Sequence, residues 1–284
     1  RADEARDVAH RAEDGSLRLL YVAPERLFND RFLSWLSKVG PASFAIDEAH
    51  CISEWGHDFR PEYRRLSELR ARFPGASLHA FTATATPRVQ EDIVEQLQLR
   101  EPEIMIGRFD RPNLTYRVVP RTDVLTQVME AVKRHETQAT IVYCISRKET
   151  ENLASSLRAN KIYARAYHAG LDHAERRKVQ DEFAQEKLNV VVATVAFGMG
   201  IDRSDVRCVL HSSHPKSVEA YQQETGRAGR DGLPAECLLL YSGVDTNKWI
   251  NLIQRSAEES EVEVPAAWIN HQIEHVRAMQ SFCQ

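Results

Sequence analysis

The chain has 284 residues, of which 43% are hydrophobic and 27% are charged, a balance typical of a folded protein of about two domains. This composition excludes a disordered or collagen-like chain, and the absence of a long apolar run or a signal-peptide pattern argues against membrane and secreted classes. The net charge of −4 provides no global basic field, so any contact with nucleic acid must be local.

The cysteines are few and widely spaced, with no Cys-x-x-Cys pair: Cys51, Cys144, Cys208, Cys237 and Cys283. This pattern predicts reduced thiols in an intracellular protein, and it argues against a disulfide framework or a complete zinc site. The sequence starts at Arg1 and stops at Gln284, each inside a helix-like stretch, so we expect a piece of a longer protein.

Short apolar runs alternate with amphipathic helical patterns, which predicts α/β layers. Val190–Ala193 is apolar throughout, as expected for a parallel strand that is buried on both faces. The expected strands are Leu17–Val22, Ser43–Ile46, Ser77–Phe81, Ala139–Cys144, Tyr163–Tyr167, Asn189–Ala193, Val206–His211 and Cys237–Tyr241.

Three helices carry recognisable start signals. Thr86 precedes a proline at the first helical position, Ser146 with Glu149 forms a capping box, and Asp172 with Glu175 has a similar spacing.

The polar segment Gly107–Pro120 contains two prolines and is predicted to link two lobes. We expect a first lobe over residues 1–108, a second over 109–243, and an incomplete helical element over 244–284.

Two adjacent acids, Asp47 and Glu48, follow the predicted strand Ser43–Ile46. Strands of α/β proteins present their carboxyl ends to ligands. In a nucleoside triphosphatase the first acid would hold Mg²⁺, and the second would position or deprotonate the attacking water. Taken alone, the pair also fits an ordinary acidic strand end.

The next segment, Cys51–Arg65, combines aromatic residues, a histidine and arginines with Gly and Pro. Bases stack on aromatic rings and arginines pair with phosphates, so the segment is a candidate nucleic-acid loop. A solvated basic loop around a buried Trp55 is the alternative.

Together with six further segments, the Asp47–His50 box and its aromatic loop resemble the ordered motifs of RecQ-family DNA helicases. These segments are Tyr21–Leu27, Phe81–Thr86, Tyr143–Arg147 with Tyr167–Leu171, Ala193–Asp202, and Gln223–Gly232. The resemblance covers about Leu17–Ser242. It implies an α/β fold of two RecA-like lobes with parallel sheets flanked by helices, the first lobe truncated, followed by the helical start of a further subdomain.

The resemblance also implies roles for individual residues. Asp47 would bind Mg²⁺ with ATP, Glu48 and Gln223 would act at the catalytic centre, and Gly200 and Asp202 would contact the nucleotide. Arg227 and Arg230, three apart between glycines, suit a clamp on a transferring phosphoryl group. A Gly-rich turn with exposed arginines is the alternative. The residues expected to bind DNA or couple it to hydrolysis are His50, Trp55, His57, Phe59, Arg60, Thr82, Thr84, Ser146, Arg147, His168 and Thr194. Without the resemblance, Thr82 and Thr84 would be plain strand residues, and Thr194 a strand-end cap.

The sequence departs from the family in two places. No lysine follows a glycine, so the phosphate-binding loop Gly-x-x-x-x-Gly-Lys-Ser/Thr is absent and is expected upstream of Arg1. We therefore expect the chain by itself to be inactive as an ATPase. The family's zinc subdomain is expected downstream, with Zn²⁺ bound there, and Cys283 is interpreted as a helix residue and not a ligand.

The resemblance implies an ATP-dependent 3′-to-5′ DNA helicase of recombination and repair, with single-stranded and duplex DNA as partners. An RNA helicase with the same acidic box is one alternative, against which the Trp55–Arg60 loop argues. A non-catalytic nucleic-acid-binding or docking module is another. We expect an intracellular location, cytoplasmic at the nucleoid in a bacterium or nuclear in a eukaryote.

Overall fold

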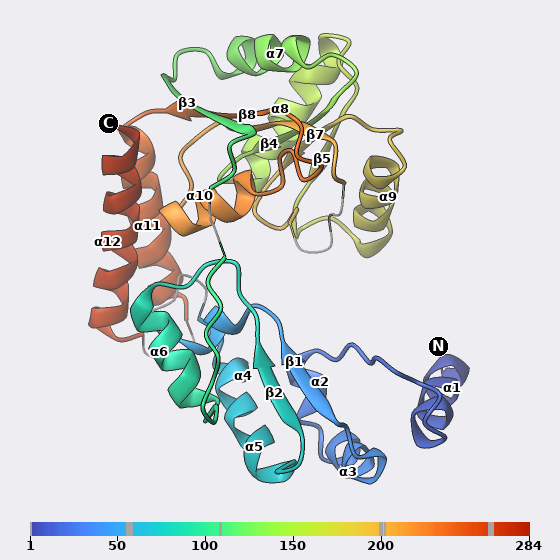
Figure 1. Cartoon of the computed structure of the whole chain (residues 1–284). Coiled ribbons are helices and arrows are strands. Elements are labelled where there is room, and N and C mark those ends of the chain that lie inside the picture. Colours follow the sequence, from blue (N-terminus) through green and yellow to red (C-terminus); the bar gives the residue numbers. More distant parts are fainter. Residues whose placement is uncertain (1, 55–58, 108–109, 199–200, 202, 261–263) are drawn as a thin grey trace. The chain divides into compact units, whose positions relative to one another are not determined.

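A computed structural model describes residues 2–54, 59–107, 110–198, 201, 203–260 and 264–284. The chain divides into two compact units, Arg1–Gly107 and Arg108–Gln284, and each is described by itself (Figure 1). None of the helices in these described ranges is long and apolar enough to span a membrane.

The first unit is built around a two-stranded parallel sheet of β1 (Ser43–Ile46) and β2 (Ser77–Ala80), paired from Ser43 with Ser77 to Ile46 with Ala80. Buried side chains from strands and helices, among them Leu33, Ile46 and Leu69, form one apolar core. The helices are α1 (Ala2–Glu13), α2 (Pro24–Leu27), α3 (Asp30–Val39), α4 (Pro61–Arg64), α5 (Glu68–Arg72) and α6 (Pro87–Gln96), with short 3₁₀ turns at Ala49–Ile52 and Arg65–Ser67.

The expected strand at Leu17–Val22 is wrong. This segment contains no strand, and its Tyr21 and Leu19 side chains are 88% and 65% exposed. A strand needs a neighbour for its backbone groups, and none of the described strands pairs with it. The aliphatic pattern alone could not supply that neighbour.

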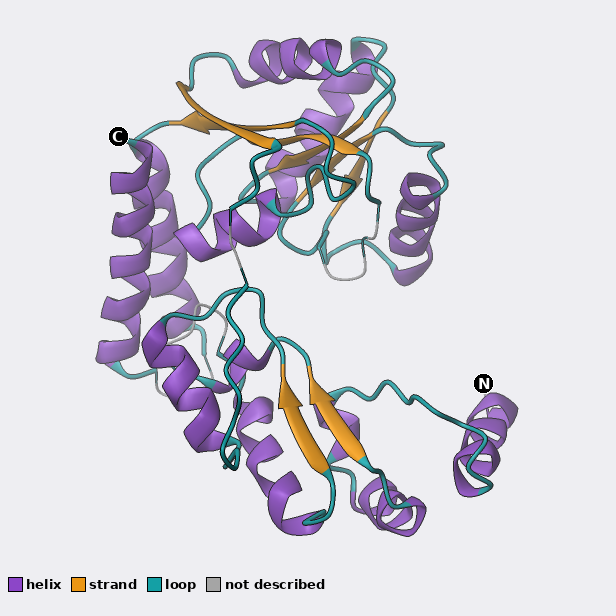
Figure 2. Cartoon of the chain, viewed as in Figure 1, coloured by secondary structure: helices purple, strands orange, loops and turns teal. Residues whose placement is uncertain are grey.

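The second unit contains a six-stranded sheet in the order β3-β8-β7-β4-β6-β5, with every pair parallel. Figure 2 shows this sheet between helices. The strands are β3 (Leu114–Pro120), β4 (Ala139–Tyr143), β5 (Ala164–Tyr167), β6 (Val190–Ala193), β7 (Val206–His211) and β8 (Ala235–Tyr241), and the helices are α7 (Val124–Arg134), α8 (Arg147–Ala159), α9 (His173–Ala184), α10 (Val218–Thr225), α11 (Val244–Glu258) and α12 (Ala266–Cys283).

Alternate residues of the central strands point into two separate cores. Ile141 and Val191 join a core that includes Phe183 of α9, whereas Val142 and Val192 join a core that includes Leu157 of α8. Helices therefore cover both faces, which explains why β6 is buried along its whole length. The parallel α/β architecture expected from the sequence is confirmed.

The prediction that Gly107–Pro120 is only a linker is wrong over its second half, which forms β3. This strand lies at the edge of the sheet and pairs with β8 from Leu114 to Pro120. Its side chains are largely exposed, so it lacks the apolar run of a central strand, and an edge strand tolerates a proline at its end.

The other expected strands are confirmed to within two residues, and so are the helix starts. Thr86 and Asp172 accept hydrogen bonds from the backbone N–H groups of Val89 and Glu175, at 3.4 and 2.8 Å. Ser146 and Glu149 form the expected reciprocal capping box at the start of α8.

The C-terminal helices α11 and α12 lie in the second unit. Met279 and Cys283 of α12 pack on Tyr221 of α10 and Leu239 of β8. All five cysteines are free and buried. Burial raises the pKa of the Cys144 and Cys283 thiols to about 11, so both stay protonated at neutral pH.

A buried carboxylate anchors the edge of the sheet. Glu236 of β8 accepts hydrogen bonds from Arg117 at 2.9 Å and from Arg134 at 3.1 Å, and it lies 2.9 Å from His135 Nε2. Burial raises the pKa of Glu236, but the bonds from His135 and Arg134 lower it by more, so the net pKa lies below its ordinary value of 4.5.

We expect Glu236→Gln to lower the free energy of unfolding at pH 7 by about 1–3 kcal/mol, because charged hydrogen bonds contribute about that much. A lowered pKa in the folded state contributes stability above the unfolded pKa, and that contribution is lost as pH falls through the folded pKa. The difference between wild type and variant in urea denaturation should therefore shrink below about pH 4.5. Glu136→Gln, an exposed neighbour of His135, is the control. An unchanged difference at pH 3 would contradict the linkage.

Candidate nucleotide and nucleic-acid sites

The two acids lie where β1 ends. The N–H of Phe81 donates to the Ile46 carbonyl at 2.8 Å, and the N–H of Ala49 donates to the Phe81 carbonyl at 2.9 Å, so the backbone beyond β2 supports the turn. Asp47 is exposed, and its Oδ1 accepts the Glu48 N–H at 2.9 Å. Glu48 has a left-handed backbone with φ 50, a conformation that ordinary residues adopt at a cost and that clusters at functional sites.

His50 joins this turn to the threonine segment after β2. Its buried Nδ1 lies 2.9 Å from Thr82 Oγ1 and 3.3 Å from Glu48 Oε2. Thr82 Oγ1 in turn donates to the Thr84 carbonyl at 3.1 Å. Both threonines lie beyond the end of β2, so the alternative reading of them as strand residues is wrong. One polar chain therefore connects the second acid to the Phe81–Thr86 segment.

The aromatic loop, residues 53–60, leaves this turn directly. Its Trp55 and His57 lie outside the described residues. At its base the Arg60 N–H donates to the Cys51 carbonyl at 2.9 Å, and Glu54 pairs with Arg64 at 3.1 Å. The Arg64 guanidinium lies 5.6 Å from the centre of the half-buried Phe59 ring.

In the second unit, sheet register brings several expected site residues to one edge. Tyr143 of β4 pairs with Ala193 of β6, which also pairs with Tyr167 of β5. Because these three strands end together, the segments that begin after them share the carboxyl edge. These segments carry the expected DNA-binding residues Ser146, Arg147, His168 and Thr194.

Arg147 and His168 meet at Gly170. A Cβ on Gly170 would lie 3.1 Å from Arg147 Nη1 and 3.2 Å from His168 Nδ1, so glycine leaves room for both side chains. His168 Nε2 lies 2.9 Å from Glu151 Oε1, while its buried Nδ1 has no hydrogen-bond partner among the described residues. Thr194 is half-buried, and its N–H donates to the Tyr167 carbonyl at 3.1 Å.

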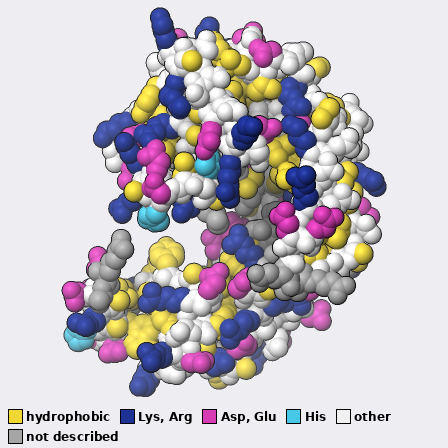
Figure 3. Space-filling view, turned by 180° about the vertical axis from the view of Figure 1, so that it is seen from behind, with side chains coloured by type: hydrophobic (Ala, Val, Ile, Leu, Met, Phe, Trp, Pro, Cys, Tyr) yellow, Lys and Arg dark blue, Asp and Glu magenta, His cyan; other side chains and the backbone are white. Residues whose placement is uncertain are grey.

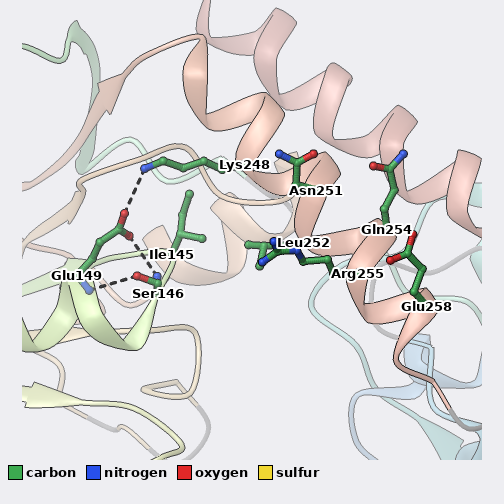
Figure 4. A pocket seen from close by; sticks show the side chains of 9 residues that line it. All are labelled: Ile145, Ser146, Glu149, Lys248, Asn251, Leu252, Gln254, Arg255 and Glu258. Carbon is green, nitrogen blue, oxygen red and sulfur yellow. Dashed lines mark hydrogen bonds and ion pairs between the residues drawn. The ribbon is translucent and has the colours of Figure 1, made fainter.

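A pocket of about 540 Å³ adjoins the start of α8 (Figure 4). Lys248 of α11 donates to Glu149 Oε1 at 3.1 Å, and Ser146 Oγ accepts the Glu149 N–H at 3.2 Å. Sequence reasoning missed that α11 lines this pocket, because no motif marks its Lys248 and Arg255.

Figure 3 shows Lys and Arg side chains interspersed with Asp and Glu on the visible face, in keeping with the net charge of −4.

The arginine loop, residues 226–230, follows α10, which carries Gln223. Arg227 is buried and donates to the Gly198 carbonyl at 2.5 Å, whereas Arg230 is exposed and donates to the Ile201 carbonyl at 3.0 Å. Both arginines thus contact the segment that follows β6. Gly200 and Asp202, expected to contact the nucleotide, lie outside the described residues.

Residues that sequence reasoning missed hold the arginine loop in shape. Arg111 donates to the carbonyls of Ala228 and Gly229 at 2.9 and 2.7 Å, and Asn113 donates to those of Gly229 and Leu233, each at 2.9 Å. A Cβ on Gly229 would lie 2.5 Å from Asn113 Nδ2 and 2.7 Å from the Leu233 carbonyl oxygen. Gly229 is therefore needed for the close packing of the loop against Asn113 and Leu233. The glycine at this position was the one sequence signal that could have indicated such close packing.

A buried polar layer lies beneath this loop. His211 Nε2 lies 2.6 Å from Glu224 Oε2, and the His211 ring stacks on Tyr143 with centroids 5.3 Å apart. Burial raises the pKa of the Tyr143 phenol, which stays a neutral donor to the Phe197 carbonyl at 2.7 Å.

The chain is similar to known helicases over most of its length. Residues 1–93 match the DEAD/DEAH box helicase family, and residues 121–232 match the helicase conserved C-terminal domain. Among solved structures, the Mycobacterium smegmatis helicase Lhr bound to ssDNA and AMP-PNP has a TM-score of 0.60 at 23% identity, covering 91% of this chain and 36% of that one. S. cerevisiae Dbp5 bound to RNA and ADP BeF3 has a TM-score of 0.58 at 18% identity, covering 85% of this chain and 63% of that one. The fold is that of a helicase core with two RecA-like lobes.

Sequence relatives narrow the class. The ATP-dependent DNA helicase RecQ of Pasteurella multocida is 46% identical over 257 residues, covering 90% of this chain and 40% of the relative. The RecQ helicase of Bacillus subtilis is 41% identical over 272 residues, covering 95% of this chain and 45% of the relative. The RecQ-like DNA helicase BLM of Xenopus laevis is 46% identical over 251 residues, covering 85% and 18%. The chain belongs to the RecQ family, and it spans less than half the length of these relatives.

The packing of Gly229 gives a direct test of the arginine loop. Gly229→Ala should destabilise the second unit more than Gly232→Ala does, although both glycines have a positive φ, of 52° and 82°. The left-handed backbone costs about 1–2 kcal/mol at either position. Only at Gly229 does the added Cβ overlap neighbouring atoms, which adds about 1–3 kcal/mol. Urea denaturation measures both values, and equal losses would contradict the close packing of Gly229.

Proposed function

We propose that this chain is the helicase core of an ATP-dependent DNA helicase that moves 3′ to 5′ and unwinds duplex DNA in recombination and repair. The observation that carries the proposal is the polar chain from Glu48 through His50 to Thr82, beside the base of the aromatic loop. It supplies a physical route by which a nucleic acid on the loop can alter the acidic centre.

In this proposal Asp47 would bind Mg²⁺ with ATP, and its exposed carboxylate at a strand's carboxyl end suits a hard cation. Mg²⁺ would neutralise charge on the phosphate oxygens. Glu48 would position or deprotonate the attacking water. Its left-handed backbone fixes where its side chain begins, and contact with His50 restrains the carboxylate.

The second lobe would contribute Arg230, Arg227 and Gln223, together with Gly200 and Asp202. Arg230 suits the arginine finger because it is exposed, whereas buried Arg227 suits a supporting contact that keeps the loop on the segment after β6. A guanidinium offers a planar pair of donors that matches a transferring phosphoryl group.

ATP binding and hydrolysis would favour different conformations of the core, because these conformations differ in their affinity for ATP. Each cycle advances the core along the strand.

DNA would lie across loop residues of both lobes. Trp55 and Phe59 would stack on bases, with His57 and Arg60 beside them, and base stacking contributes about 1–3 kcal/mol per base. In the second lobe Ser146, Arg147, His168 and Thr194 would contact the phosphate backbone. Their common edge position supports this assignment, and so does the buried His168 Nδ1, which has no hydrogen-bond partner in the part of the chain that the structure describes.

The proposal is tested on the longer protein by phosphate release with single-stranded DNA or RNA, and by strand displacement on duplexes with 3′ or 5′ overhangs. We expect stimulation by DNA, displacement only from a 3′ overhang, and loss of both in Glu48→Gln. Stimulation by RNA alone would favour an RNA helicase, and displacement from a 5′ overhang would overturn the polarity. Residues 1–284 alone should release no phosphate, because the sequence contains no Gly-Lys pair to bind the β- and γ-phosphates.

Arg230→Ala in the longer protein should lower kcat by about 10³–10⁵, the range typical of an arginine finger, with little change in ATP or DNA affinity. Arg230→Lys should recover only part of the loss, because a point charge does not reproduce the planar fork. Arg177→Ala, whose side chain is 76% exposed on α9, is the matched control. A near-normal kcat in Arg230→Ala would remove the finger from this position.

A further inference from the structure

Two histidines face each other on α12, away from every motif discussed above. His271 and His275 are one helical turn apart, and their Nε2 atoms lie 3.1 Å from each other. The rings meet edge to face, with centroids 4.5 Å apart and an interplanar angle of 77°. Their side chains are 28% and 19% exposed, so solvent reaches the pair.

A carboxylate lies on the far side of each ring. His275 Nδ1 is 3.6 Å from Glu219 Oε2 on α10, and His271 Nδ1 is 3.9 Å from Glu274 Oε2. A carboxylate beside Nδ1 favours the tautomer with its proton on Nδ1, which leaves a lone pair on Nε2. At 3.1 Å the two Nε2 atoms lie within hydrogen-bond distance, so they either share a proton or hold another positive centre between them.

The spacing suits a metal ion as that centre. With metal–nitrogen bonds of about 2.0–2.1 Å, nitrogens 3.1 Å apart subtend an angle of about 95–102° at the ion. This angle corresponds to neighbouring positions of octahedral or square-planar coordination, and imidazole is a preferred ligand of divalent Zn, Cu and Ni. Water can complete the coordination because the pair is partly exposed.

We propose that His271 and His275 bind a divalent first-row transition metal ion, and that Glu219 orients His275 for this role. The arrangement of carboxylate, histidine and metal is the usual outer shell of a histidine-ligated site. Glu219 Oε2 lies 3.6 Å from His275 Nδ1, on the side of the ring opposite the proposed ion.

The site would join two elements of the second unit. Glu219 lies in the first turn of α10, the helix that leads into the arginine loop, and α12 packs on α10 through Met279 and Tyr221. An ion bound at His275 would stabilise the contact between the two helices, because it binds the folded chain in preference to the unfolded one.

Another group of potential ligands, His135, Cys208 and Glu236, has its ligand atoms within 4.8 Å of one another. In this group Arg117 and Arg134 already pair with the Glu236 carboxylate. Burial raises the pKa of the Cys208 thiol, which therefore stays protonated. A cation is therefore disfavoured at this second group, which makes His135→Ala a useful control.

The test is calorimetric titration of residues 1–284 with Ni²⁺ or Zn²⁺ at pH 7.5. We expect one site that His271→Ala or His275→Ala weakens at least tenfold, and that Glu219→Gln weakens about 10–100-fold, the usual cost of losing an outer-shell partner. His135→Ala and His173→Ala, the latter an exposed helix histidine, should leave the affinity unchanged. With Cu²⁺, the paramagnetic resonance spectrum should show coupling to two nitrogens in the wild type and to one in either alanine variant.

Melting curves of each metal-free variant establish that it is folded before titration. The proposal is overturned if both alanine variants bind as tightly as the wild type, or if His135→Ala abolishes binding. It is also overturned if the folded wild type binds no ion more tightly than His271→Ala does, in which case a shared proton occupies the space between the two rings.

Discussion

Parallel strand register is the constraint on which the second unit depends. Tyr143, Ala193 and Tyr167 end their strands side by side, so segments from distant parts of the sequence begin at one edge of the sheet. A shift of one residue in any of these strands would move its side chains to the opposite face and would exchange the side chains that fill the two cores. The packing of the cores therefore fixes the position of the loops as strictly as any contact within the loops.

Strand register places the loops at one edge of the sheet, and polar groups hold the loops there by hydrogen bonds. Arg227 donates to the Gly198 carbonyl, His211 pairs with Glu224, and Arg111 donates to the arginine loop from the segment before β3. Each bond satisfies a group that would be costly to leave unpaired in a buried setting. The loop is thus held by its own lobe, with Arg230 exposed and donating to the Ile201 carbonyl.

In the first unit, too, a few hydrogen bonds hold the segments that follow the strands. A backbone pair between Phe81 and the end of β1 brings the acidic turn next to the threonine segment. His50 Nδ1 lies between them, 2.9 Å from Thr82 Oγ1 and 3.3 Å from Glu48 Oε2. Membership of the RecQ family gives this arrangement a chemical context. The proposed coupling of nucleic acid to hydrolysis needs only that a displacement at the base of the aromatic loop is transmitted through these few bonds.

The sequence by itself determined the α/β class, the central strands, the helix caps and the motifs of the family, because each depends on local pattern. Val190–Ala193 and the Ser146–Glu149 capping box are examples in which the residues alone carry the signal. Tertiary structure decided which segments find a neighbouring strand to pair with. Leu17–Val22 has strand-like residues but no described neighbour, whereas the polar segment Leu114–Pro120 becomes a strand because β8 offers it one. It also decided the partners of Gly229 and of the His271–His275 pair, since Asn113 and Glu219 reach them only through the fold.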